Sequence, residues 1–127
     1  MARFLWICLG GAVGTGGRYL LCGWADRLVG AAFPAGTLAV NVVGSFLLAL
    51  IAHVGVETDL ISPTVRYALT TGVMGGFTTY STFNHETLEL YRDGAFGQAS
   101  LNVAVTVLAC LAAGVLGLAT GRAIAGR

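Results

Sequence analysis

The strongest constraint on this chain is a series of long apolar stretches, each of the length that crosses a lipid bilayer. A bilayer-spanning helix needs roughly 20 mostly apolar residues. Four segments meet this requirement, at 4–24, 36–56, 65–91 and 98–123. Short polar segments separate them, and together they use nearly all of the 127 residues. We therefore predict an all-α, multi-pass membrane protein with a single transmembrane domain, 1–127, made of four transmembrane helices.

The composition excludes a soluble globular fold. Hydrophobic residues make up 56% of the chain and charged residues only 10%, whereas a soluble domain carries about a quarter charged residues. A chain with so few charged residues is expected to expose apolar side chains to lipid. No nucleic-acid partner is expected. The first segment follows Met1-Ala2-Arg3 and is longer than the core of a secretory signal, so we interpret it as a retained first helix.

The basic residues bear on orientation in the membrane, which follows the Lys and Arg of short loops near helix ends. The chain has 7 arginines and no lysine. With four spans, both termini and the loop between the second and third segments share one side. That side holds Arg3, Arg66, Arg122 and Arg127, and the other holds Arg27 and Arg92, with Arg18 near the same end. So weak a bias permits an antiparallel (dual-topology) homodimer without requiring one.

The third segment carries the most informative run of residues, from Gly72 to Asn84. It contains Gly75-Gly76 at mid-membrane depth, followed by a dense series of hydroxyl side chains. Glycine costs about 1 kcal/mol relative to alanine inside a helix, so we expect the third helix to be broken at mid-membrane. A break exposes carbonyls that can coordinate a small cation and N–H groups that favour an anion. The alternative is a kinked helix whose Ser and Thr bond to their own turn.

Two aromatic residues accompany these hydroxyls. Tyr80 and Phe83 lie three residues apart, on the same face as the polar track that includes Ser81 and Thr82. Rings at this spacing usually pack in a core or face lipid. The edge of an aromatic ring is positive, however. A small anion could therefore shed its water between ring edges and N–H or O–H donors.

Polar side chains in the other spans add candidates. Asn41 lies among Val and Leu, where it either bonds another helix or serves an ion pathway, and the sequence leaves these interpretations even. Arg18 is expected to have a vestibule or structural role that raises the local anion concentration. Glu86 either faces that vestibule or caps the third helix. His53 and His85 are interpreted as ordinary residues of the membrane boundary.

The fourth segment has a row of residues at a spacing of four. The row consists of Asn102, Thr106, Cys110 and Gly114. One helical face is therefore polar at its start and then becomes small and apolar. Such a face is either half of a pore wall or a packing seam.

In combination, these motifs resemble the Fluc (CrcB) family of fluoride channels. The resemblance rests on Gly-Gly-Phe-Thr-Thr-Tyr-Ser-Thr-Phe-Asn at 75–84, Gly-Thr-Leu-Ala-Val-Asn at 36–41 and Gly-Gly-Arg-Tyr at 16–19. It covers the whole chain in length, helix number and order of motifs. It implies a fluoride-selective channel, not an enzyme, that exports fluoride passively to lower cytoplasmic fluoride. It also implies an antiparallel homodimer with two pores in membrane lipid.

The resemblance also implies roles for individual residues. The pore residues carried over are Asn41, Tyr80, Ser81, Thr82, Phe83 and, on the fourth helix, Thr106. A structural sodium ion, which is not transported, is implied on the two-fold axis, held by the backbone carbonyls of Gly75 and Thr78. The chain departs from the family in having Tyr80 where a phenylalanine is expected. Cys110 and Gly114 also supply no strong hydroxyl to the fourth-helix wall.

Two other classes of protein are alternatives. A small dual-topology proton-coupled multidrug exporter needs a carboxylate embedded in the membrane. The first three spans have no Asp or Glu in their interiors, and Glu86 follows the motif. A non-transporting assembly protein would use the glycines but would leave the hydroxyl and aromatic run without a purpose. The fluoride channel is therefore our prediction from the sequence.

Overall fold

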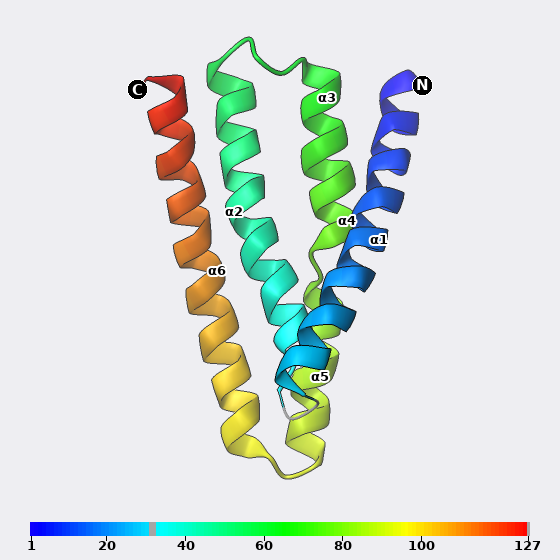
Figure 1. Ribbon diagram of the computed structural model, residues 1–127, viewed down its shortest axis with the longest axis vertical. Coiled ribbons are helices and arrows are strands. Elements are labelled where there is room, and N and C mark those ends of the chain that lie inside the picture. Colours follow the sequence, from blue (N-terminus) through cyan, green and yellow to red (C-terminus); the bar gives the residue numbers. More distant parts are fainter. Residues whose placement is uncertain (31–32, 127) are drawn as a thin grey trace.

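The computed structural model describes residues 1–30 and 33–126, and these form an up-and-down array of helices without a strand (Figure 1). Three helices are continuous: α1 (Ala2–Val29), α2 (Ala35–Glu57) and α6 (Phe96–Ala125). The third span is divided into α3 (Pro63–Tyr67), the π-helix η1 (Ala68–Met74), α4 (Gly75–Phe77) and α5 (Tyr80–Arg92). The all-helical prediction is confirmed.

The continuous helices have the length and composition of membrane spans. α1 has 28 residues, α2 has 23 and α6 has 30, and each contains an apolar window long enough to cross a bilayer. Each helix extends a few residues beyond the apolar stretch that we expected. Large apolar side chains such as Leu9, Val13 and Leu108 are exposed on the outside of the array, where a membrane protein meets lipid.

The chain ends and the connections alternate between the two ends of the array. Figure 1 shows the N-terminus, the C-terminus and the loop between α2 and α3 at one end. The connection between α5 and α6 lies at the other end. We call the first of these the terminal end and the second the far end. In this arrangement α2 packs along α6, and α1 packs along η1 and α4.

Glycines allow these helices to approach at backbone distance. A Cβ atom at Gly10 of α1 would lie 2.5 Å from the carbonyl oxygen of Ala68 in η1, and one at Gly14 would overlap the carbonyl of Val73. A Cβ atom at Gly117 of α6 would likewise overlap the carbonyl of Phe46 in α2. Small residues therefore serve packing within the chain, which is how helices associate where no hydrophobic effect acts between them.

The third helix is broken at two threonines. Thr78 (φ −84°, ψ 157°) and Thr79 (φ −151°, ψ 114°) are extended, and α5 begins at the next residue. Gly75, by contrast, is helical (φ −63°, ψ −36°). The glycine pair that suggested the break is therefore not where the chain leaves the helix. β-Branched residues accept extended backbone readily, and the Thr79 hydroxyl caps the new helix by accepting from the N–H of Thr82.

Candidate functional site

The break is held by one side chain from α2. The Nδ2 of Asn41 donates to the carbonyl oxygen of Thr79 at 3.0 Å, and the N–H of Thr79 donates to Oδ1 of Asn41 at 2.8 Å. Both residues are buried, with 9% of Asn41 and 5% of Thr79 exposed. The carboxamide thus pairs with both peptide groups that the break frees at Thr79. Broken backbone at membrane depth requires such partners.

The break leaves carbonyls without their helical donors, including those of Gly75 and Thr78. In a continuous helix the N–H of Thr79 would bond to the carbonyl of Gly75, but it bonds to Asn41 instead. The N–H of Thr82 would bond to the carbonyl of Thr78, but it bonds to the hydroxyl of Thr79 at 3.1 Å. Gly75 and Thr78 are the two residues to which the family resemblance assigned cation-binding carbonyls. Gly75 lies at the exposed surface of the single chain, and Thr78 is half-buried.

Hydroxyl groups cluster at the start of α5. The Thr79 hydroxyl donates to Oγ1 of Thr82 at 2.9 Å and lies 3.3 Å from the hydroxyl of Ser81. Thr79 is therefore the centre of the cluster, although sequence reasoning did not select it. Its position three residues before Thr82, at the start of a new helix, is the signal for an N-cap that could have identified it.

The two aromatic rings lie one turn apart on α5. The ring centroids of Tyr80 and Phe83 are 5.7 Å apart, with an angle of 55° between the ring planes. Phe83 is buried at 8% exposure, whereas 78% of Tyr80 is exposed on the single chain. Phe83 thus belongs to the interior of the subunit, and Tyr80 projects from it.

A cavity of about 300 Å³ brings most of the predicted pore residues together. Its lining residues are Asn41, Ser45 and Leu48 of α2, Thr78 and Thr79 of the break, Tyr80 and Phe83 of α5, and Thr106, Val107 and Cys110 of α6. Ser81 and Thr82 do not line it and take part in the hydroxyl cluster instead. We call this space the central cavity. It combines an amide, hydroxyls and two ring systems within a largely apolar wall.

The wall from α6 is tied to α5 by a chain of hydrogen bonds. Asn102, only 1% exposed, accepts from the hydroxyl of Thr106 at 3.3 Å and donates to the hydroxyl of Thr87 at 2.9 Å. That hydroxyl donates to the carbonyl oxygen of Phe83 at 2.7 Å. The row expected on the fourth helix is therefore partly a packing seam. Thr87 was not anticipated, because its partner lies on a different helix.

The predicted vestibule residues lie away from the central cavity. Glu86 accepts from the hydroxyl of Thr37 at 2.8 Å. It lines a separate pocket of about 340 Å³ together with Asp26, Glu89 and Asp93. These residues place it toward the far end. Arg18, on α1, makes no hydrogen bond or ion pair with the residues that the structure describes, and it is half-buried.

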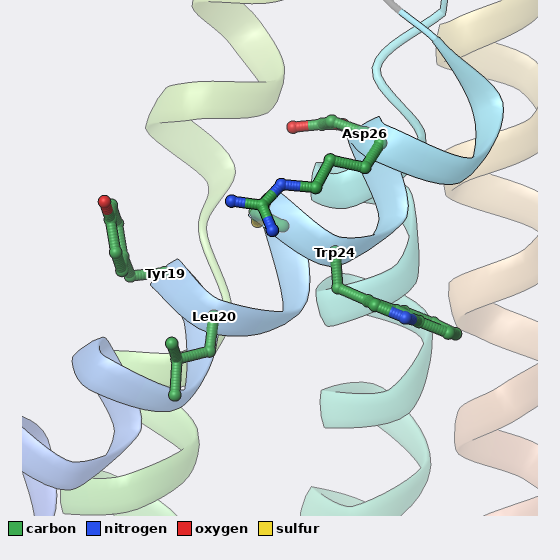
Figure 2. A pocket seen from close by; sticks show the side chains of 7 residues that line it. Tyr19, Leu20, Trp24 and Asp26 are labelled. Atoms are coloured by element: carbon green, nitrogen blue, oxygen red, sulfur yellow. The ribbon is translucent and has the colours of Figure 1, made fainter.

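The outer face of α1 has a depression of about 350 Å³, shown in Figure 2, lined by Tyr19, Leu20, Trp24, Asp26 and neighbouring residues of the same helix. It shares no lining residue with the central cavity. Tyr19 is 79% exposed and Trp24 is 60% exposed. Exposed Tyr and Trp near a helix end are typical of the boundary between membrane and water. This depression therefore has the character of a membrane boundary and is separate from the candidate site.

Comparison with known proteins places the chain in a family. The family model described as "CrcB-like protein, Camphor Resistance (CrcB)" matches residues 5–118. The chain is 53% identical over 122 residues, covering 96% of both proteins, to a fluoride-specific ion channel FluC from Sorangium cellulosum. A FluC protein from Anaeromyxobacter dehalogenans is 54% identical over 113 residues, which cover 89% of this chain and 90% of the relative. One from Geobacter metallireducens is 49% identical over 122 residues, covering 96% and 98%. The family expected from the motifs at 16–19, 36–41 and 75–84 is thus confirmed, and the chain belongs to the CrcB family.

Proposed function

We propose that this protein is the subunit of a fluoride-selective channel in the bacterial inner membrane, and that it lets fluoride leave the cytoplasm passively. The central cavity is the observation that carries the proposal. It joins Asn41, Tyr80, Phe83 and Thr106 from three helices around one space. Relatives of similar length and about half-identical sequence are named fluoride-specific ion channels, and such a protein is a transporter, not an enzyme.

The chemistry of the cavity suits a small anion. A carboxamide carries two N–H donors, and Asn41 uses one of them on the carbonyl of Thr79. The second N–H is left for a ligand. The positive edges of Tyr80 and Phe83 add weaker contacts. The free N–H and the two ring edges together replace part of the water that a strongly hydrated ion must lose. The hydroxyls of Ser81 and Thr82 add polar groups at the N-terminal end of α5.

A second subunit completes the pore. The central cavity lies at the surface of the single chain, and 78% of Tyr80 is exposed beside it. One chain therefore leaves the cavity open to lipid, which an ion cannot cross. The weak arginine bias of the sequence permits two chains of opposite orientation to insert. An antiparallel homodimer would close two such cavities by symmetry.

The break also fits a structural sodium ion. The carbonyls of Gly75 and Thr78 have lost their helical donors, and unwound carbonyls of this kind coordinate sodium in membrane proteins. Those two oxygens from each of two subunits would hold the ion. When bound, sodium supplies a fixed positive charge between the two third segments. The ion would stabilise the dimer and would lie apart from the path of fluoride.

Fluoride efflux from proteoliposomes tests the proposal. Purified protein is reconstituted into vesicles loaded with potassium fluoride, and a fluoride electrode follows the release after valinomycin is added. We expect rapid fluoride release, and a chloride electrode should detect no comparable release from vesicles loaded with potassium chloride. Release no faster than that from empty vesicles would overturn the channel. Accessibility of tags at both termini from both sides of the membrane would test the antiparallel arrangement separately.

A further inference from the structure

A groove of about 540 Å³ runs between α2 and α6 from the central cavity toward the terminal end. Its lining residues are Ala49, Ala52, His53, Val56 and Glu57 of α2, and Cys110, Leu111, Gly114, Val115 and Leu118 of α6. Cys110 lines both this groove and the central cavity. The two spaces are therefore successive parts of one face of the α2–α6 pair. We call this second space the terminal groove.

His53 is the unusual side chain in this groove. Its ring packs against α6, because a Cβ atom added at Gly121 would lie 3.1 Å from Cδ2 and 3.2 Å from Cβ of the histidine. Its Nε2 atom is enclosed and has no hydrogen-bond partner within residues 1–30 and 33–126. A buried polar atom without a partner is rare in native proteins and calls for a specific explanation.

The enclosed nitrogen determines which side of the ring can meet a ligand. A neutral imidazole has one N–H donor and one acceptor nitrogen. Among backbone groups, an enclosed N–H without a partner is rarer than an enclosed acceptor without one, and we apply the same preference to the imidazole ring. The proton is therefore better placed on Nδ1, which is not enclosed. The ring can then offer an N–H donor to the terminal groove.

The other lining residues make this donor important. The groove is otherwise apolar, apart from the weak S–H donor of Cys110 and the carboxylate of Glu57, which only accepts when it is ionised. Glu57 lies one turn beyond His53 on α2. Arg66 of α3, a basic residue that packs on the end of α2, donates to the carbonyl of Gly55 at 2.8 Å. Arg122 follows Gly121 on α6. An anion leaving the central cavity past Cys110 thus meets one strong donor inside the groove.

We propose that His53 donates a hydrogen bond to fluoride in the terminal groove, which extends the ion path from the central cavity toward the terminal end. This inference rests on the proposed fluoride-channel function and adds a residue and a route to it. It also revises the interpretation of His53 as an ordinary boundary residue. The polar row of α6 ends at Thr106, and the histidine supplies polarity from α2 where Cys110 and Gly114 do not.

Three variants test the donor. His53→Phe keeps the ring that packs on Gly121 and removes both nitrogens, whereas His53→Gln keeps an N–H donor. Leu116→Ile changes an exposed apolar residue of α6 that does not line the groove, and it serves as the matched control. We expect fluoride efflux to fall about tenfold in His53→Phe, the size expected from losing one hydrogen bond to a charged group. His53→Gln and Leu116→Ile should stay near the wild-type rate.

The outcomes separate this inference from the channel itself. If the wild-type protein releases no fluoride, the proposed function fails. If the wild-type protein conducts and a folded His53→Phe protein conducts equally well, only the role of His53 is overturned. Equal losses in His53→Phe and His53→Gln would also overturn it, because the effect would then not depend on a donor. Size-exclusion profiles and unfolding temperatures establish that each variant is folded.

A spectroscopic measurement needs no substitution at His53. The chain has 2 histidines, and His85 is exposed, with its ring 3.6 Å from Glu89. In the His85→Gln protein, the ¹⁵N-histidine NMR signals therefore come from His53 alone. We expect sodium fluoride to shift the signal of the protonated ring nitrogen and sodium chloride at the same concentration to leave it unchanged. Signals that fluoride does not move would overturn the proposal.

Discussion

The carboxamide of Asn41 forms two hydrogen bonds with the backbone of Thr79, a residue 38 positions away on the third span. One bond satisfies the carbonyl of Thr79 and the other its N–H. The pairing replaces the helical bonds that Thr79 would otherwise make, so the chain can leave the helix inside the membrane. The two interpretations of Asn41, helix contact and ion pathway, are therefore compatible. The first uses one amide hydrogen, and the second requires the other.

Asn41→Ala should destabilise the subunit as well as reduce fluoride efflux. It leaves two buried backbone groups without partners, at a cost of about 1–3 kcal/mol each. A fall in unfolding temperature in detergent, followed by tryptophan fluorescence, would measure this cost. Asn84→Ala is the matched control, because Asn84 is an exposed asparagine of the third span, five residues after Thr79. An unfolding temperature in Asn41→Ala equal to that of Asn84→Ala would contradict a role in holding the break.

The spans could be predicted from the sequence because they depend on local composition. A run of about 20 apolar residues has few alternatives in a chain with so few charges. The precise break could not be predicted in this way. Gly75 and Gly76 are intrinsically poor helix residues, yet both are helical, because α1 packs against this part of the chain and stabilises it. The chain leaves the helix at Thr78 and Thr79, where Asn41 supplies the missing partners.

The residues of the candidate site also divide into those that local sequence reveals and those that only contacts between helices reveal. Asn41, Tyr80, Phe83 and Thr106 were selected from the sequence, since polar and aromatic residues inside spans are conspicuous. Thr79 was overlooked among several neighbouring hydroxyls, because what distinguishes it is a partner on another helix. His53 was dismissed for a similar reason. Its sequence position suggests a membrane boundary, and only the packing of α2 on α6 reveals an enclosed nitrogen.

The adjacent glycines Gly75 and Gly76 should respond differently to substitution. A Cβ atom at Gly76 would overlap the carbonyl of Gly11 and lie 3.1 Å from the N atom of Thr15, whereas one at Gly75 meets no atom within 4 Å. Gly76→Ala should therefore lower the stability of the subunit itself. Gly75→Leu should leave helix content unchanged but reduce dimer formation and efflux, because Gly75 would face the partner subunit.

Circular dichroism and size-exclusion chromatography with light scattering separate these two effects. Normal assembly and normal efflux in Gly75→Leu would argue against a sodium site on the dimer axis at this residue. Loss of helix content in Gly75→Leu would show that the side chain meets a neighbour within its own subunit.

Removal of sodium should weaken the dimer. An ion that binds only the assembled state stabilises it by mass action, by about 2.7 kcal/mol at 100 times its dissociation constant. We expect a lower unfolding temperature and slower efflux when sodium is replaced by N-methyl-D-glucamine throughout purification, with recovery when sodium is added back. Potassium chloride at the same ionic strength controls for screening. Identical unfolding curves in all three solutions would exclude a stabilising sodium site.

Phe83→Ile should reduce fluoride efflux severely while the dimer persists. The substitution keeps an apolar side chain at a buried position but removes the positive ring edge that lines the central cavity. An aromatic contact contributes about 0.5–1.5 kcal/mol, so a loss of up to about tenfold is expected from this contact alone. Efflux and the size-exclusion profile are measured together. Tyr91→Ile, which removes a ring paired with Phe96 outside the cavity, is the control. Unchanged flux in Phe83→Ile would remove Phe83 from the pore.

Tyr80→Phe isolates the one hydroxyl that distinguishes this pore. The Tyr80 hydroxyl makes no hydrogen bond with the part of the chain that the structure describes, and the ring is 78% exposed on the single chain. We therefore expect the unfolding free energy of the subunit to change by less than about 0.5 kcal/mol.

The ring edge is retained in Tyr80→Phe, so efflux should stay within about threefold of wild type, whereas Tyr80→Ile should lose most of the efflux. A loss of about tenfold or more in Tyr80→Phe would instead identify the hydroxyl as a donor to the ion, because that is the effect of removing one hydrogen bond to a charged group. Single-channel recording of both variants, at equal fluoride concentration on the two sides, distinguishes these outcomes from a change in the number of assembled channels.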